Sequence, residues 1–153
     1  MSVRLEKAIK QKRFVNEHIH VSINLYYTAA RHIHFLNRIL KPYKLSIQQF
    51  NILRIIRGQR GEPISVKQLT DRMIDKMSNA SRLVEKLRSK GLVERNECPD
   101  DRRQVEVLIT EVGISTIEQA STVIESGIME YLGSLSKGDA KELNKLLDSI
   151  NNS

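Results

Sequence analysis

Cysteine and long apolar runs are scarce in this sequence. Its 153 residues include a single cysteine, Cys98, so the chain cannot form an internal disulfide. No apolar run approaches the roughly 20 residues that a membrane-spanning helix needs, and residues 1–13 lack the apolar centre of a signal peptide. We therefore expect a cytoplasmic protein with no membrane partner. The length suits one domain that buries a sizeable core.

Motifs of catalysis are also missing. The sequence has no nucleophile elbow, no phosphate-binding glycine loop and no histidine–carboxylate constellation at a fixed spacing. The serines near Arg82 have no candidate base close in the sequence, and their place at a helix start already has a capping explanation. The sequence therefore argues against an enzyme, and it predicts no cofactor.

The four histidines form two pairs, His18 with His20 and His32 with His34. Residues two apart on a helix point to different sides, so neither pair can chelate a metal ion by itself. We therefore expect no metal site and ordinary surface or interface histidines. A metal site assembled across a dimer is the alternative.

Charge is plentiful and unevenly placed. Lys and Arg number 25 against 18 Asp and Glu, which gives a formal net charge of +7. Residues 1–60 carry 12 basic against 2 acidic residues, whereas residues 104–153 carry 3 against 8. This balance favours a polyanionic partner, although charge alone concerns solubility and nonspecific binding. The cations of residues 4–13 are either a solvated face or an arm that touches phosphates.

Residues 65–91 are the stretch around which the chain is organised, and they predict a short helix, a tight turn and a longer helix. In the longer helix Ala80, Leu83, Val84 and Leu87 recur at three- and four-residue steps and form one buried stripe. The polar residues around the helix start and along its wet face suit base edges and phosphates in a major groove. They are Ser78, Asn79, Ser81, Arg82 and Lys86. An ordinary amphipathic surface helix is the alternative.

A β-hairpin is predicted directly after Gly91, which is a natural helix C-cap. The segments LVERNE and QVEVLIT alternate apolar and polar residues, and a turn around Pro99 separates them. A helix-turn-helix followed by a hairpin that carries Arg102 and Arg103 is a winged helix, and its wing can place an arginine in the minor groove. A solvated charged turn is the alternative.

Long amphipathic helices are predicted at both ends of the chain. Apolar residues keep helical spacing over residues 14–40, and Pro42 stops that helix. Thr110 and Ser136 can each cap a further helix with an apolar stripe within residues 110–150. A small winged-helix domain cannot cover these stripes, so we expect a two-fold homodimer. A closed monomeric bundle is the alternative.

Two capping boxes are predicted between these parts. Ser46 with Gln49 starts a helix whose buried stripe includes Phe50, and Ser65 with Gln68 starts the helix that supports the reading helix.

Three segments resemble the MarR (multiple antibiotic resistance regulator) family of winged-helix transcription factors. They are LSIQQFNILRII, MSNASRLVEKLRSKGLVER and PDDRRQVEVLITEVG. The resemblance covers roughly residues 15–150. It implies a mainly α fold with a small β-wing, in which residues 46–110 form the winged helix-turn-helix and N- and C-terminal helices make the dimer. It further implies that Arg103 enters the minor groove and that Asp101 orients it through an ion pair.

The resemblance and the residues together predict a sequence-specific regulator that binds double-stranded DNA. We expect a homodimer on a pseudo-palindromic operator, with half-sites on the order of 10 base pairs apart, and repression relieved by a small aromatic or phenolic effector. The residues that we expect to line its cleft are Tyr26, Tyr27, His32, Phe35 and Arg54. Tyr26 and Phe35, each taken singly, are also explained as plain core or interface residues.

Two alternatives concern the same surface. A winged helix can serve as a protein-interaction module that does not read DNA, because fold alone does not settle function. The peroxide-sensing branch of the family places its reactive cysteine near the start of the first long helix, where this sequence has none. We therefore treat Cys98 as incidental, with redox tuning of the wing as the alternative.

Overall fold

The computed structural model describes residues 5–97 and 105–152. The α-helices within these ranges are α1 (Leu5–Ala8), α2 (Glu17–Leu40), α3 (Ile47–Arg57), α4 (Val66–Arg72), α5 (Ala80–Ser89), α6 (Glu111–Tyr131) and α7 (Lys137–Asn151). A 3₁₀ helix, η1 (Lys41–Tyr43), joins α2 to α3, and the described strands are β1 (Ile64–Ser65), β2 (Val93–Glu97) and β3 (Val105–Ile109). The predicted fold class, mainly α with a small β-wing, is confirmed.

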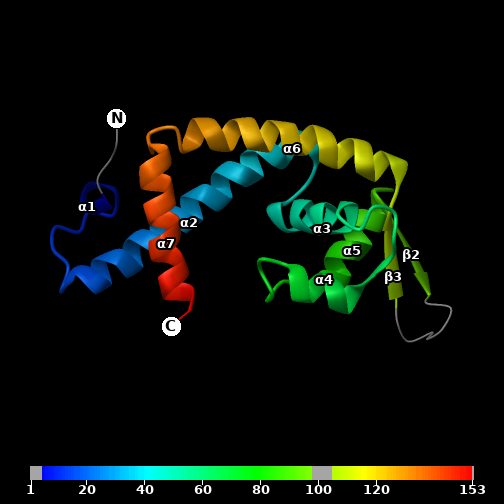
Figure 1. The fold of residues 1–153 in the computed structure, drawn as a ribbon, viewed down its shortest axis with the longest axis horizontal. Coiled ribbons are helices and arrows are strands. Elements are labelled where there is room, and N and C mark those ends of the chain that lie inside the picture. The colour runs from blue at the N-terminus through cyan, green and yellow to red at the C-terminus, as the bar shows by residue number, and fades with distance from the viewer. Residues whose placement is uncertain (1–4, 98–104, 153) are drawn as a thin grey trace.

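The elements form a compact head with long helices extending from it. Helices α3, α4 and α5 and the sheet gather at one end of the molecule, and α6 runs over them toward the other end (Figure 1). The first half of α2 and all of α7 lie at that other end, away from the head (Figure 1). The head is the winged helix-turn-helix.

The helix starts follow from local capping. Thr110 accepts a hydrogen bond from the Gly113 backbone N–H, as the sequence predicts. Ser46, Ser65 and Ser136 each begin a helix with a complete capping box. Each cap satisfies backbone donors that a helix start leaves without a partner.

The start of α2 differs from its prediction. The helix begins at Glu17 rather than at residue 14, because Asn16 has an extended backbone and its side chain accepts the Ile19 N–H at 3.0 Å. Val15, which the apolar spacing would place inside the helix, lies before it and is 90% exposed. An asparagine cap therefore overrides the periodicity.

The sheet is antiparallel with the order β1–β3–β2. In the predicted hairpin Val93 pairs with Ile109, and Glu97 pairs with Val105. Ile64 in β1 pairs with Val107 on the other edge of β3. The hairpin prediction is confirmed, whereas the two-residue β1 was not predicted from the sequence.

The core lies inside the head and extends to the facing ends of α2 and α6. Ile52, Leu53, Leu69, Val84 and Leu87 of the head are all fully buried. Leu40 of α2 and Ile117 of α6 are equally buried and belong to the same cluster. Three of the four predicted stripe residues of α5 are buried, and the fourth, Leu83, is half-buried. Burial of this stripe fixes the opposite face of α5 toward solvent.

The connection from α4 to α5 is longer than the predicted tight turn and covers residues 73–79. Met73 is buried, and the Asn51 side chain of α3 accepts the Ile74 N–H at 3.1 Å. This bond holds the connection against α3, because a buried amide oxygen needs such a donor.

The joint between α5, β2 and α6 is tightly closed. Gly91 has φ +70°, and the Leu92 N–H bonds the Leu87 carbonyl at 3.1 Å, so the predicted C-cap is confirmed. The Thr110 hydroxyl donates to the Gly91 carbonyl at 2.7 Å. A Cβ on Gly113 would lie 2.1 Å from the Leu92 carbonyl oxygen, so α6 can approach this closely only with glycine there.

The outer helices leave apolar side chains in solvent. No residue of α7 is buried in the described chain, and the exposed fractions of Leu146 and Ile150 are 54% and 50%. On α2, Ile19 and Val21 are 44% and 49% exposed. The outer helices α2 and α7 therefore do not bury these apolar side chains in a closed bundle within one chain. None of the helices in the described ranges is long and apolar enough to cross a membrane.

Candidate DNA-binding surface

The start of α5 is built by two short polar side chains. Asn79 is the N-cap, and its Oδ1 accepts the Arg82 N–H at 2.9 Å. The Ser78 hydroxyl donates to the Asp75 carboxylate at 2.6 Å, and this bond is the first of several that lower the pKa of Asp75. Ser78 and Asn79 therefore lie just before the helix and shape its start, while Ser81 follows on its exposed side.

A hollow of about 270 Å³ lies beside the start of α5. Its lining residues are Gln48, Ser78, Asn79, Arg82, Leu83 and Lys86. The structure thus brings four of the five predicted α5 contacts together, and Ser81 does not line this hollow. Gln48 comes from α3 and was missed from the sequence. Its polar side chain beside a capping box was the signal that it faces outward.

The cations around α5 differ in whether a carboxylate neutralises them. Glu85 accepts from Arg88 at 2.6 Å and from Arg95 of β2 at 3.4 Å. The Arg88 bond is the main reason that the pKa of Glu85 is lowered. Within the described residues, Arg82 and Lys86 have no carboxylate within ion-pair distance. They leave positive charge free beside the hollow, which suits phosphate.

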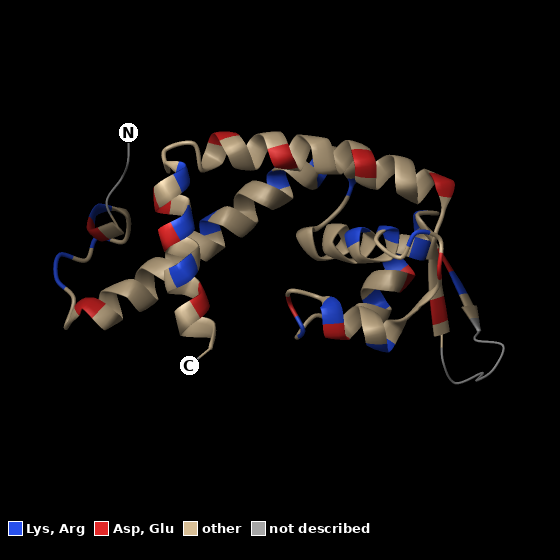
Figure 2. Cartoon of the chain, viewed as in Figure 1, with Lys and Arg blue, Asp and Glu red and all other residues tan. Residues whose placement is uncertain are grey.

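Charge is distributed unequally among the helices. Lys and Arg recur along α5, whereas α6 carries acidic residues and no Lys or Arg (Figure 2). A polyanion is therefore attracted to the α5 side of the head and repelled along α6.

Lys90 at the end of α5 has a structural role. Its Nζ donates to the Lys44 carbonyl and, at 3.0 Å, to the Gln49 Oε1. Burial lowers the pKa of Lys90, with smaller contributions from Lys86 and Lys44. Lys90 therefore fixes the end of α5 to Lys44, between α2 and α3, and to Gln49 of α3.

The predicted wing residues Asp101, Arg102 and Arg103 lie outside the described residues, as does Cys98. The strands that lead to them, β2 and β3, are in register up to the Glu97–Val105 pair. The proposed minor-groove contact and the Asp101–Arg103 ion pair stay predictions.

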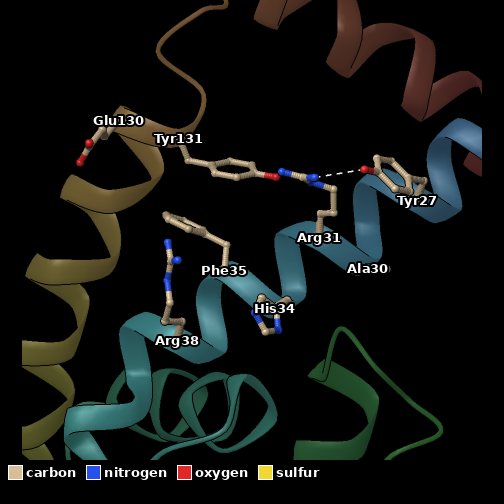
Figure 3. A pocket seen from close by; sticks show the side chains of 8 residues that line it. All are labelled: Tyr27, Ala30, Arg31, His34, Phe35, Arg38, Glu130 and Tyr131. Atoms are coloured by element: carbon tan, nitrogen blue, oxygen red, sulfur yellow. Dashed lines mark hydrogen bonds between the residues drawn. The ribbon is translucent and has the colours of Figure 1, made fainter. Parts of the chain in front are cut away.

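A pocket of about 740 Å³ lies between α2 and the end of α6 (Figure 3). The Phe35 and Tyr131 rings stack with centroids 4.4 Å apart, and Arg31 donates to the Tyr27 hydroxyl at 3.0 Å. This bond is the main cause that raises the pKa of Arg31. Arg38 reaches toward the Phe35 ring, 5.9 Å from its centroid (Figure 3). We call this the aromatic pocket.

A second cavity, of about 380 Å³, lies where α2 and α6 meet the head. We call it the inner cleft. Its lining is largely apolar and consists of Ile33, Leu36, Ile47, Gln48, Phe50, Asn51, Arg54, Met73, Ile74, Asp75, Ile124 and Ile128. The cleft therefore touches both the outer helices and the connection that leads into α5.

The five predicted effector residues do not share one cavity. Tyr27 and Phe35 line the aromatic pocket, and Arg54 lines the inner cleft. Tyr26 is 80% exposed, and His32 packs 5.4 Å from the Tyr131 ring; neither lines these cavities. Successive residues on a helix turn by about 100°, which separates Tyr26 from Tyr27.

The histidines are likewise dispersed. His20 stacks on Phe14 and lies 3.8 Å from the Glu6 carboxylate. Among the residues that the structure describes, no three His, Cys, Asp or Glu side chains gather in an arrangement that could hold a metal ion. A site shared across a dimer stays the alternative.

Comparison with known proteins finds matches to one family. Residues 45–105 match the model of the MarR family. The chain is 28% identical over 121 residues to the HTH-type transcriptional repressor IacR of Pseudomonas putida. This match covers 79% of this chain and 71% of IacR.

Solved structures agree with this match. A mutant MarR from E. coli complexed with operator DNA superposes with a TM-score of 0.77 at 25% identity, covering 91% of this chain and 99% of that one. BpsR of Bordetella bronchiseptica superposes with a TM-score of 0.76 at 23% identity, covering 87% and 94%. The winged-helix head thus matches the MarR family of transcription regulators, and the chain is similar to regulators of that family over most of its length.

Proposed function

We propose that this regulator is a homodimeric repressor that binds a pseudo-palindromic operator and releases it when a small molecule binds. The observation that carries the DNA-binding part is the hollow beside α5, where Arg82 and Lys86 lie without carboxylate partners among the described residues. The E. coli MarR of the same fold was solved with operator DNA, and the similar IacR is a repressor.

The contacts follow from the order of elements. The start of α5 enters the major groove, where Ser78, Asn79, Ser81 and Arg82 meet base edges or nearby phosphates. Lys86, one turn further along, neutralises a phosphate. The wing would add Arg103 in the minor groove, with the help of Arg102 and Asp101. Base contacts then supply sequence preference, and phosphate contacts supply position.

The homodimer is supported by the apolar side chains of the outer helices. Leu143, Leu146 and Ile150 of α7 and Ile19 and Leu25 of α2 are each at least 38% exposed. They belong to helices that extend away from the head (Figure 1). A second copy covers such stripes symmetrically, and it presents two reading heads to two half-sites.

Binding to duplex DNA at several salt concentrations tests the reading function. Random duplex is compared with a pool selected for binding, and Arg82→Ala and Arg103→Ala are compared with the unsubstituted protein. We expect enrichment of a two-fold symmetric site and a loss of affinity in both variants. Lys86→Ala should weaken all sequences alike and lower the salt slope by roughly one unit.

Arg57→Ala is the matched control for these substitutions, because Arg57 pairs with Glu118 of α6 at 3.1 Å and lies outside the hollow. It should retain operator binding. Loss of affinity in the control as large as in Arg82→Ala would mean that net charge alone, rather than the α5 surface, drives binding.

The effector is proposed to occupy the inner cleft. A ligand there touches α2 and α6 on one side and residues 73–75 on the other, so it can favour one placement of the reading head over another. Arg54 is the member of the predicted set that lines this cleft. The aromatic pocket, with Tyr27 and Phe35, is the second candidate for the same ligand.

Two arginine variants distinguish the cavities. Operator release is measured during titration with benzoate, phenol and nicotinate, since the DNA binding of the similarly folded BpsR is regulated by 6-hydroxynicotinic acid. Loss of the response in Arg54→Ala would place the ligand in the inner cleft, and loss in Arg31→Ala would place it in the aromatic pocket. No response in the unsubstituted protein would contradict relief by these compounds.

A protein-interaction module is the second candidate function. Ile74 and Met77, which precede α5, are 84% and 95% exposed, and exposed apolar side chains beside a reading helix suit a protein partner. Binding that is insensitive to salt, enriches no duplex and ignores Arg82 would favour this module over the repressor.

A further inference from the structure

Gln48 is a wall residue of two different cavities. It lies in the first turn of α3, after the N-cap Ser46. It lines the hollow that holds Arg82 and Lys86, and it also lines the inner cleft. Among the described residues that line the hollow or the inner cleft, Gln48 is the one that lines both.

The neighbouring amides of α3 are already engaged. Gln49 accepts from the Ser46 N–H at 3.1 Å and from Lys90. Asn51 accepts from the Ile74 N–H. Gln48 differs, because the structure gives its side chain no hydrogen-bond partner within the described residues, and it is only half-buried. Its amide therefore keeps two donors and an acceptor for an external group.

The chemistry of the two sides is unequal. Most residues that line the hollow are polar, and two of them are cations without carboxylate partners among the described residues. An anionic phosphate or a base edge that enters the hollow therefore meets a free amide donor on Gln48. The inner cleft is walled by apolar residues such as Leu36, Phe50 and Ile124, so a polar group of a bound ligand finds few partners there besides Gln48, Asn51, Arg54 and Asp75. One amide cannot satisfy both occupants fully.

We propose that Gln48 is a DNA-contacting residue that also couples the inner cleft to operator binding. With the cleft empty, the amide donates to DNA in the hollow. A ligand in the cleft engages or displaces the same side chain and withdraws that donor. This inference rests on the proposed repressor function and names one residue through which the effector acts.

The size of the effect is bounded. A hydrogen bond to a charged phosphate is worth more than a neutral one, so loss of the donor should weaken binding by about tenfold. A ligand can shift an equilibrium only by its differential interaction with the two states. The part of the release that passes through Gln48 therefore cannot exceed the fold-loss caused by removing its amide.

The first experiment measures operator affinity of Gln48→Ala and Gln48→Glu, with Gln119→Ala as the matched control. Gln119 is exposed on α6 and bonds Ser115 of its own helix. We expect about tenfold weaker binding for Gln48→Ala, a larger loss for Gln48→Glu, because its carboxylate repels phosphate, and no change for the control. Affinity of Gln48→Ala equal to that of the unsubstituted protein would overturn the proposal.

The second experiment fills the inner cleft covalently. Ile33 lines the cleft and is 47% exposed. The thiol of Ile33→Cys in a Cys98→Ser background therefore reacts with benzyl methanethiosulfonate to form a mixed disulfide that carries a benzylthio group, and methanesulfinate leaves. Labelling should weaken operator binding when Gln48 is present and add no further loss to Gln48→Ala. Val112→Cys, 60% exposed and outside the cleft, controls for the label, and gel filtration checks that labelling leaves the oligomer intact.

The outcomes separate the inference from the proposed function. If Arg82→Ala loses binding but the label acts equally with and without Gln48, the coupling is wrong and the repressor proposal stands. If no variant or label changes binding, or no operator is found, the proposed function fails and the role of Gln48 fails with it.

Discussion

Replacing Gly113 by alanine should destabilise the protein, although the residue lies inside a helix. Alanine is favoured over glycine in helices by about 1 kcal/mol, so helix propensity predicts stabilisation. The structure predicts the opposite, since the new Cβ would lie 2.1 Å from the Leu92 carbonyl oxygen and 2.7 Å from Ile109 Cγ1. The first of these neighbours is backbone and cannot rotate away.

The magnitude follows from what must move. Moving α6 away from Leu92 strains the packing and costs about 1–3 kcal/mol. It also stretches two hydrogen bonds of Thr110, one from its backbone N–H to the Leu92 carbonyl and one from its hydroxyl to the Gly91 carbonyl. Each such bond contributes about 1 kcal/mol. After the propensity gain is subtracted, we expect the free energy of unfolding to fall by about 2–4 kcal/mol.

Urea unfolding followed by circular dichroism, at one protomer concentration, measures this change. Gly138→Ala in α7 is the matched control, because its Cβ would meet only Ser136 Oγ at an ordinary 3.6 Å. The control should be neutral or stabilised by up to about 1 kcal/mol. A Gly113→Ala protein as stable as the control would refute the close approach.

Three further predictions concern charge, capping and assembly. The hydrogen bond from Arg88 is the main cause that lowers the pKa of Glu85 from its ordinary value of about 4.5. The ionised Glu85 carboxylate therefore stabilises the folded protein above that pH, and this stabilisation is lost as the pH falls below it. In urea unfolding, the free energy of unfolding of Glu85→Gln should fall less over this acid range than that of the unsubstituted protein. Ser136→Ala removes a capping box and should cost about 1 kcal/mol, seen as a lower urea midpoint. Leu146→Lys places a charge on the exposed stripe of α7 and should weaken the proposed dimer in analytical ultracentrifugation, and an unchanged dimer would exclude this face from the interface.

Local signals explain what the sequence predicted well. The caps at Ser46, Ser65, Thr110 and Ser136 join a side chain to a backbone group three residues away, so the pattern lies within one short segment. The buried stripe of α5 and the Gly91 cap are equally local. The start of α2 was wrong because Asn16 was not recognised as a cap.

Contacts between distant segments could not be predicted in this way. Gln48 and Arg82 meet in one hollow although they belong to different helices, and no periodicity within either helix indicates that meeting. The predicted effector residues were grouped by chemical type, yet Tyr27 and Arg54 line separate cavities. The two cavities lie against different sides of α2, and Arg54 reaches the inner cleft from α3. The long connection before α5 depends on Asn51, which lies in α3.

The closed joint at Gly113 makes α6 a lever arm. The helix Glu111–Tyr131 extends about 31 Å at 1.5 Å per residue. The close contact between Gly113 and Leu92 fixes the head rigidly to the N-terminal end of α6. If a partner subunit holds the far end, a tilt of only about 5° carries the head through about 3 Å. Hydrogen bonds to DNA do not survive such a displacement. Operator release then needs no rearrangement inside the winged helix, and a small change in angle at the outer helices is sufficient.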